Sequence, residues 1–93
     1  GLTIDKGAHR VHLNGREIPL TAREFDLLVF LASHPDQVLS RETIFERVWG
    51  LDSEGDLATV TVHIGKLREK LEPDPANPQY IETVWGAGYR FRA

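Results

Sequence analysis

The clearest pattern in the chain is a helical repeat of apolar residues in its second half. Four apolar residues share one narrow stripe when successive positions are placed about 100° apart. These are Val60, Ile64, Leu67 and Leu71. The pattern predicts an amphipathic helix that begins near Asp56 or Leu57 and ends before Pro73, with this stripe against a hydrophobic core.

The two flanks of this predicted helix carry polar and basic side chains. They are Thr59, His63, Lys66 and Lys70 on one flank, and Thr61 and Arg68 on the other. Such donors suit a helix in the DNA major groove, where side chains reach base edges and flanking cations meet phosphates. An ordinary surface helix with a solvated basic face explains this segment, taken alone, about equally well.

The first twenty residues alternate between apolar and polar side chains, which predicts a small antiparallel sheet. Residues 2–5 and 9–13 have the period of half-buried strands. Asn14-Gly15 predicts a tight hairpin turn, because both residues tolerate positive φ angles. A third short strand is expected over residues 16–20.

Two helices are expected between this sheet and the basic helix. Thr21 and Glu24 form a capping box that begins a helix running to about Ser33, with an inward face of Phe25, Leu28, Leu31 and Ala32. Ser40 caps the next helix, residues 41–49, and Gly50 ends it. Its apolar face is expected to consist of Ile44, Phe45, Val48 and Trp49.

The remaining segments read as an exposed loop and a closing hairpin. Residues 51–56 contain Gly55 and three acidic side chains, which predicts an exposed loop. Residues 80–84 and 89–92 alternate as two strands around Trp85-Gly86-Ala87-Gly88. The chain is therefore expected to end in a β-hairpin.

Composition limits the candidate functions. The 93 residues make one small domain, and the absence of cysteine excludes disulfides, thiolate metal sites and thiol catalysis, and favours a cytosolic origin. The net charge of −3 argues against nucleic acid, but residues 58–93 hold five Lys/Arg against four Asp/Glu. Because a surface field depends on local charge, this basic C-terminal third can still bind phosphates, with strongly salt-dependent affinity.

Four stretches in this order and spacing resemble the C-terminal effector domain of OmpR/PhoB-type response regulators. They are residues 20–28, residues 39–41 leading to Val48-Trp49-Gly50, residues 59–71, and residues 83–91. The resemblance covers nearly the whole chain and implies an α+β fold, a winged helix-turn-helix. It implies a four-stranded N-terminal antiparallel sheet, three helices and a C-terminal hairpin wing.

The resemblance also implies a function in transcription. Residues 1–93 would be the DNA-binding effector domain of a cytoplasmic bacterial two-component regulator whose upstream receiver domain is absent from this chain. A sensor histidine kinase would phosphorylate that receiver, and receiver dimerisation would drive binding to direct repeats. The helix over about 57–72 would enter the major groove, and the wing over 80–92 would lie on the backbone toward the minor groove.

Individual contacts follow from matching positions in the family. Lys66 is expected to read a base, since an ammonium can donate to guanine O6 and N7. Arg68 and His63 are expected on phosphates, and His63 can donate from a neutral ring and gains charge in mild acid. The complete set of expected DNA-contacting residues is Arg41, Thr59, Thr61, His63, Lys66, Arg68, Lys70, Thr83, Trp85 and Tyr89. For Tyr89, a core aromatic that closes the hairpin is an equally good interpretation.

Three positions depart from the family pattern. Gly65 stands where relatives often carry a long polar or basic side chain, and Ala58 stands where some members have arginine. Trp85 stands at the wing tip, where many members carry arginine for the minor groove. Trp85 could pack on sugars, contact a partner or cover the core, and its indole is expected to be at least partly exposed. A glycine within a helix costs about 1 kcal/mol relative to alanine.

Two other classes of function compete with DNA binding. An enzyme is not expected: His9 and His12 lie on opposite faces of a strand, which makes a poor metal site, and no catalytic set or cofactor motif is visible. A protein-interaction role is the stronger alternative. Leu51, Asp52 and Glu54 occupy the family's transactivation loop, which can touch RNA polymerase. That role would be added to DNA binding, because it leaves the polar stripe of residues 59–70 unexplained.

Overall fold

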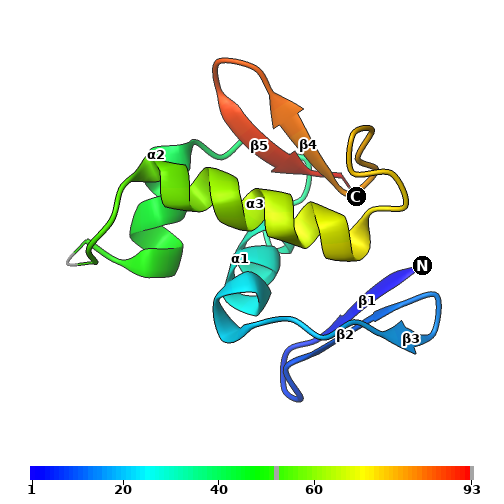
Figure 1. The fold of residues 1–93 in the computed structure, drawn as a ribbon. Coiled ribbons are helices and arrows are strands. Elements are labelled where there is room, and N and C mark those ends of the chain that lie inside the picture. Colours follow the sequence, from blue (N-terminus) through cyan, green and yellow to red (C-terminus); the bar gives the residue numbers. More distant parts are fainter. Residues whose placement is uncertain (52, 93) are drawn as a thin grey trace.

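A computed structural model describes residues 1–51 and 53–92, and its centre is the long helix α3, Leu57–Leu71. Figure 1 shows α3 crossing the molecule, with a β-hairpin on one side and helix α1, Ala22–Ala32, on the other. The N-terminal sheet lies beyond α1, and α2, Arg41–Ile44, lies at the N-terminal end of α3. No helix in the described ranges is long and apolar enough to span a membrane.

The N-terminal sheet has three antiparallel strands in the order β1-β2-β3. They are Leu2–Asp5, Arg10–Leu13 and Arg16–Glu17. The predicted hairpin is confirmed, with Asn14 and Gly15 both at positive φ. The expected fourth strand is not present in the described residues, and the third strand ends at Glu17 instead of Leu20, because the segment up to Thr21 turns toward α1.

Helix α1 begins with the predicted capping box. The Thr21 hydroxyl accepts from the backbone N–H of Glu24 at 3.2 Å, and the Glu24 carboxylate accepts from that of Thr21 at 2.9 Å. The predicted inward face is correct for three residues, Phe25, Leu28 and Leu31, whereas Ala32 is only partly buried. Leu27 and Glu24 are also buried, so the covered face is wider than the sequence pattern indicates.

The second predicted helix has two parts. A single turn, α2, is capped by the Ser40 hydroxyl, which accepts from the Thr43 N–H at 3.1 Å. A π-helical turn, η1, follows over Phe45–Trp49, and Gly50 ends it at a φ of 100°. A π turn is locally wider than an α-helix, and it carries Trp49 toward α3, as the ring contact described below shows.

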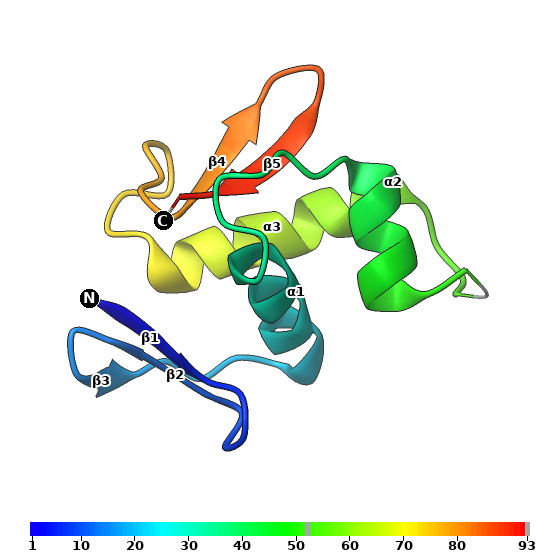
Figure 2. The ribbon, with the colours of Figure 1, turned by 180° about the vertical axis from the view of Figure 1, so that it is seen from behind.

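The closing hairpin consists of β4, Ile81–Val84, and β5, Gly88–Phe91. It is joined to the segment between α1 and α2, which Figure 2 shows passing beside β5. Leu39 N–H donates to the Tyr89 carbonyl at 2.8 Å, and Tyr89 N–H donates to the Leu39 carbonyl at 2.9 Å. The extended link predicted at Val38-Leu39 therefore forms an isolated antiparallel bridge with β5, which fixes the hairpin against the helices.

The core lies where α1, α3 and the hairpin meet. All four members of the predicted stripe on α3 are buried, namely Val60, Ile64, Leu67 and Leu71. A buried carboxylate, Glu72, closes the far end of the core by accepting from the backbone N–H groups of Gln79, Tyr80 and Ile81. The connector between α3 and β4 is thus held in place by hydrogen bonds to one side chain.

Candidate nucleic-acid interface

The outward face of α3 carries exposed polar side chains, and it has no side chain at Gly65 near the middle of the helix. Asp56 caps the helix by accepting from the Ala58 N–H at 3.0 Å, which fixes where this face begins. Thr61 and Lys66 are exposed, and Val62 between them is 52% exposed. A Cβ at Gly65 would meet no atom within 4 Å, so the middle of the helix leaves room for close approach by a partner.

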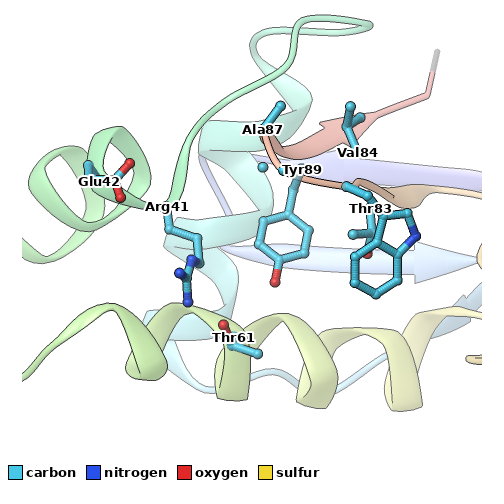
Figure 3. A pocket seen from close by; sticks show the side chains of 10 residues that line it. Arg41, Glu42, Thr61, Thr83, Val84, Ala87 and Tyr89 are labelled. Atoms are coloured by element: carbon cyan, nitrogen blue, oxygen red, sulfur yellow. The ribbon is translucent and has the colours of Figure 1, made fainter.

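A cleft of about 420 Å³ separates α3 from the hairpin. Its walls come from the start of α2, the second turn of α3 and the hairpin, and its lining includes Arg41, Thr61, Thr83, Trp85 and Tyr89. Figure 3 shows Arg41 and Tyr89 both directed toward the α3 backbone near Thr61. The structure thus brings together predicted site residues from three separate segments of the chain.

Arg41 is the exposed cation of this cleft. It occupies the first turn of α2, directly after the Ser40 cap, and no ion pair holds its guanidinium within residues 1–51 and 53–92. An unpaired guanidinium at the mouth of a cleft suits a phosphate, which it can bind through two parallel hydrogen bonds.

Arg68, by contrast, already has several partners within the protein. Its Nε and one terminal nitrogen donate to the Ile81 carbonyl at 3.0 and 2.8 Å, and the same terminal nitrogen donates to the Thr83 hydroxyl at 2.8 Å. The guanidinium lies 5.5 Å from the Tyr89 ring centroid. Burial lowers the pKa of Arg68, although an arginine this far above neutrality keeps its charge.

These contacts give Arg68 a structural role that the sequence pattern did not indicate. It ties α3 to β4 and sets the distance between this helix and the hairpin. The Thr83 hydroxyl accepts from Arg68 and keeps its own hydrogen for an outside acceptor. Contacts of both residues with DNA stay a prediction.

Lys70 is likewise engaged at the far end of α3. Its Nζ lies 2.6 Å from Oε1 of Glu24 on α1, and the lysine side chain is partly exposed. The charge of Lys70 is therefore used mainly to neutralise a buried carboxylate. Its expected DNA contact also remains a prediction.

His63 lies on the flank of α3 that faces η1. Its Nδ1 is 2.9 Å from the Thr59 carbonyl oxygen, one turn earlier in the helix. The Trp49 and His63 rings are in an edge-to-face contact, with their centroids 5.1 Å apart. The Arg23 guanidinium lies 5.2 Å from the Trp49 ring centroid. Because a carbonyl can only accept, Nδ1 is the donor of this hydrogen bond, and a neutral His63 ring uses its one hydrogen within α3. A DNA contact by His63 stays a prediction.

Trp49 is the site neighbour that sequence reasoning missed. It was expected only as part of an apolar helix face, yet it is half-buried and stacks on Phe45 at 5.8 Å while it supports His63. The only sequence signal for it is its place at the end of the helix, directly before Gly50.

The hairpin places its two aromatic site candidates differently. Trp85 at the turn is 91% exposed, which confirms the expected exposure of the indole. The Tyr89 side chain is 8% exposed and belongs to the core, so the core interpretation is confirmed while its hydroxyl still lines the cleft. A DNA contact by the Tyr89 hydroxyl stays a prediction.

The loop between η1 and α3 is mostly exposed where the structure describes it, and Ser53 is half-buried. Leu51 is 80% exposed and Glu54 is exposed, whereas Asp52 lies outside the described residues. The Ser53 hydroxyl donates to the Trp49 carbonyl, which anchors this loop to the end of η1.

Known proteins match the chain over most of its length. The family model described as "Transcriptional regulatory protein, C terminal" matches residues 15–91. ResD of Bacillus subtilis is 48% identical over 91 residues, which cover 97% of this chain and 38% of ResD. MtrA of Mycobacterium tuberculosis is 49% identical over 87 residues, covering 94% of this chain and 38% of MtrA.

Solved structures agree with this match. The response regulator DrrB of Thermotoga maritima, an OmpR/PhoB homolog, has a TM-score of 0.92 at 37% identity and covers 99% of this chain and 42% of its own. The RstA DNA-binding domain of Klebsiella pneumoniae, in complex with the RstA box, has a TM-score of 0.89 at 35% identity, covering 98% of this chain and 90% of its own. The chain spans about two fifths of the ResD and MtrA sequences.

Proposed function

This chain belongs to the family of C-terminal domains of OmpR/PhoB-type transcriptional regulatory proteins, and from that premise we propose that it binds double-stranded DNA at specific sequences. One observation carries the proposal: the exposed face of α3 lies beside a cleft whose free cation is Arg41. A helix about 10–12 Å across fits a major groove about 12 Å wide. The cleft would then receive the sugar-phosphate backbone that borders the groove.

The proposed contacts divide into reading and anchoring. Lys66 projects from the exposed face of α3 and would donate to a guanine edge, while Thr59 and Thr61 would reach neighbouring bases or phosphates. Arg41 and the Thr83 hydroxyl would anchor phosphates from the two sides of the cleft. Trp85 would lie against sugars near the minor groove, where its exposed indole offers an apolar surface without charge.

The whole regulator is proposed to be longer than this chain. Relatives in which the domain makes up 38% of the length have room for an upstream domain. We propose that this domain is a receiver phosphorylated by a sensor histidine kinase, that it dimerises, and that pairs of effector domains occupy direct repeats in the cytoplasm of a bacterium.

A second role is proposed for the loop after η1. A leucine that is 80% exposed, in the same loop as the exposed acid Glu54, suits a protein partner, and RNA polymerase is the proposed one. Leu51→Ser should leave affinity for DNA unchanged and abolish the additional gel shift caused by polymerase. A lost shift with DNA alone would instead place Leu51 in the fold or the DNA site.

Fluorescence anisotropy with labelled duplexes tests DNA binding itself. The logarithm of the association constant should fall linearly with the logarithm of salt concentration, by about 0.9 per phosphate neutralised, with about 4–6 phosphates contacted. Selection from random duplexes should yield a preferred site. A flat salt dependence, or no binding to any duplex at low salt, would contradict the proposal.

A further inference from the structure

The hydrogen bond of His63 fixes which ring nitrogen can face a partner. Nδ1 lies 2.9 Å from the Thr59 carbonyl oxygen, which has no hydrogen to donate. Nδ1 must therefore carry the ring hydrogen, and a neutral imidazole has only one. In the neutral ring, Nε2 is left as an acceptor with an exposed lone pair.

Nε2 is reachable from outside. Within residues 1–51 and 53–92 it has no hydrogen-bond partner, and no side-chain nitrogen or oxygen there is both buried and unpartnered. Nε2 therefore meets solvent even though the residue is half-buried. Two contacts hold the imidazole in this orientation: the Trp49 ring on one side and the hydrogen bond to the Thr59 carbonyl on the other.

The position of His63 on α3 indicates what Nε2 would meet. On a helical wheel it lies about 70° from the centre of the buried stripe, at the edge where α3 adjoins η1. Val62 and Lys66 lie farther out and are exposed. In a helix seated in the major groove, the outermost side chains face base edges and those at the flank face the phosphate wall.

We propose that His63 binds a DNA phosphate only as an imidazolium, so that this domain takes up a proton at His63 when it binds DNA. The inference rests on the proposed function. Phosphate oxygens are acceptors, and a neutral His63 would oppose one lone pair with another. Protonation converts Nε2 into a donor and adds a positive charge, which gives a charge-assisted hydrogen bond.

The surroundings supply no competing anion. No carboxylate oxygen lies within 4 Å of a His63 ring nitrogen in the part of the chain that the structure describes. Lys66 follows one turn later on α3, and Arg23 of α1 lies on the Trp49 ring. On η1, Arg47 lies over Phe30 and Glu46 is exposed without an ion pair to His63. A DNA phosphate would therefore be the first anionic partner of this ring.

The chain contains a matched control. His34 makes the same hydrogen bond, from Nδ1 to the Phe30 carbonyl four residues earlier at 2.9 Å, but beyond the end of α1 and away from α3. Substituting His34 removes an equally constrained imidazole without touching the proposed interface. Differences between the two variants then report on position and not on histidine content.

The experiment measures the dissociation constant for a selected duplex between pH 5.5 and 8.0, the range in which imidazoles titrate. The wild-type constant should rise with pH, by up to tenfold per pH unit, as linkage to one proton requires. His34→Gln should keep this dependence. His63→Gln should bind more weakly than the wild type at pH 5.5 and should lose the pH dependence. His63→Lys should bind tightly at all pH values.

Calorimetry in buffers of different ionisation enthalpy completes the test by counting protons. Uptake of up to one proton near pH 7, absent in His63→Gln, is expected. An unchanged pH dependence in His63→Gln would overturn the inference. So would affinity that rises with pH, which would mean that neutral Nε2 accepts from a base amino group. Binding that is independent of pH overturns the inference alone, whereas no binding at any pH overturns the proposed function with it.

Discussion

The ammonium of Lys70 lies 2.6 Å from Oε1 of Glu24 and so joins the last turn of α3 to the first turn of α1. Glu24 is 2% exposed and also closes the capping box on Thr21. A carboxylate this deep is stable only while it is paired and hydrogen-bonded. The pair therefore couples the orientation of the recognition helix to the helix beneath it.

The first prediction concerns acid stability. Burial raises the pKa of Glu24, but hydrogen bonds from Lys70 and Thr21 outweigh it, and the pKa lies below its ordinary 4.5. A lowered folded-state pKa means that Glu24 stabilises the fold above about pH 4.5 and that this contribution is lost as the pH falls further. Glu24→Gln should lower the free energy of unfolding at pH 7 by about 1–3 kcal/mol.

Urea unfolding at pH 7 and pH 3 measures this effect. The difference in the free energy of unfolding between the wild type and Glu24→Gln should be smaller at pH 3. Glu69→Gln is the matched control, because Glu69 is exposed on α3 and has no ion pair within residues 1–51 and 53–92. An equal gap at both pH values would show that the charge of Glu24 is unimportant.

The second prediction is that Gly65→Ala stabilises the domain. Glycine loses more backbone entropy in a helix than alanine, and the added Cβ would meet nothing within 4 Å. The free energy of unfolding should rise by about 0.5–1 kcal/mol. Denaturant titration gives the value, and a decrease would mean that the α3 backbone at Gly65 is not regular helix.

The third prediction concerns Gly88, where the hairpin touches the Leu39 link. A Cβ there would lie 2.0 Å from the Leu39 carbonyl oxygen, and the φ of 144° disfavours any side chain. Gly88→Ala should destabilise the domain by more than the ~1–3 kcal/mol that backbone strain alone costs. Gly86→Ala is the control, since its φ is 79° but nothing lies within 4 Å of its Cβ. Equal losses in both variants would contradict a role for the Leu39 contact.

Local patterns in the sequence predict most of the fold, because each depends on neighbours within a few residues. The apolar stripe of α3, the Thr21–Glu24 capping box and the Asn14-Gly15 turn are of this kind, and all three are present. The pairing of Leu39 with Tyr89 could not be predicted in this way, because the two segments meet only when α1 and α2 are packed.

The same limit applies to the site. Sequence identified Arg68 and Lys70 as cations on a helix flank, but their partners lie 13 and 46 positions away in the chain. The periodicity of a helix predicts which side of the helix a residue lies on, but it does not identify the residues from other segments that this side chain contacts. Arg41 and Lys66 are exposed, and no ion pair holds either of them in the described residues. Both therefore remain cations open to a partner, as the sequence suggested.

The fourth prediction separates base reading from anchoring. Lys66→Ala should reduce the preference for the selected site over random DNA, because a good base contact is worth about 1–3 kcal/mol. Arg41→Ala should weaken binding to both kinds of DNA equally and make the salt dependence shallower by about one unit. Anisotropy with specific and random duplexes measures both effects. The roles are assigned wrongly if Arg41→Ala alters discrimination and Lys66→Ala does not.

The last prediction concerns Trp85 at the hairpin turn. Because the indole is 91% exposed, it contributes little to the core, and Trp85→Arg should leave the melting temperature within a few degrees of the wild type. An arginine at this position can enter a narrow A·T-rich minor groove, whose negative potential attracts cations. Trp85→Arg should therefore tighten binding, most of all at sites with A·T-rich flanks. Trp85→Ala separates the added charge from the lost indole, since only the arginine should produce a flank-dependent gain. Equal gains at G·C-rich and A·T-rich flanks would place residue 85 against phosphates outside the minor groove.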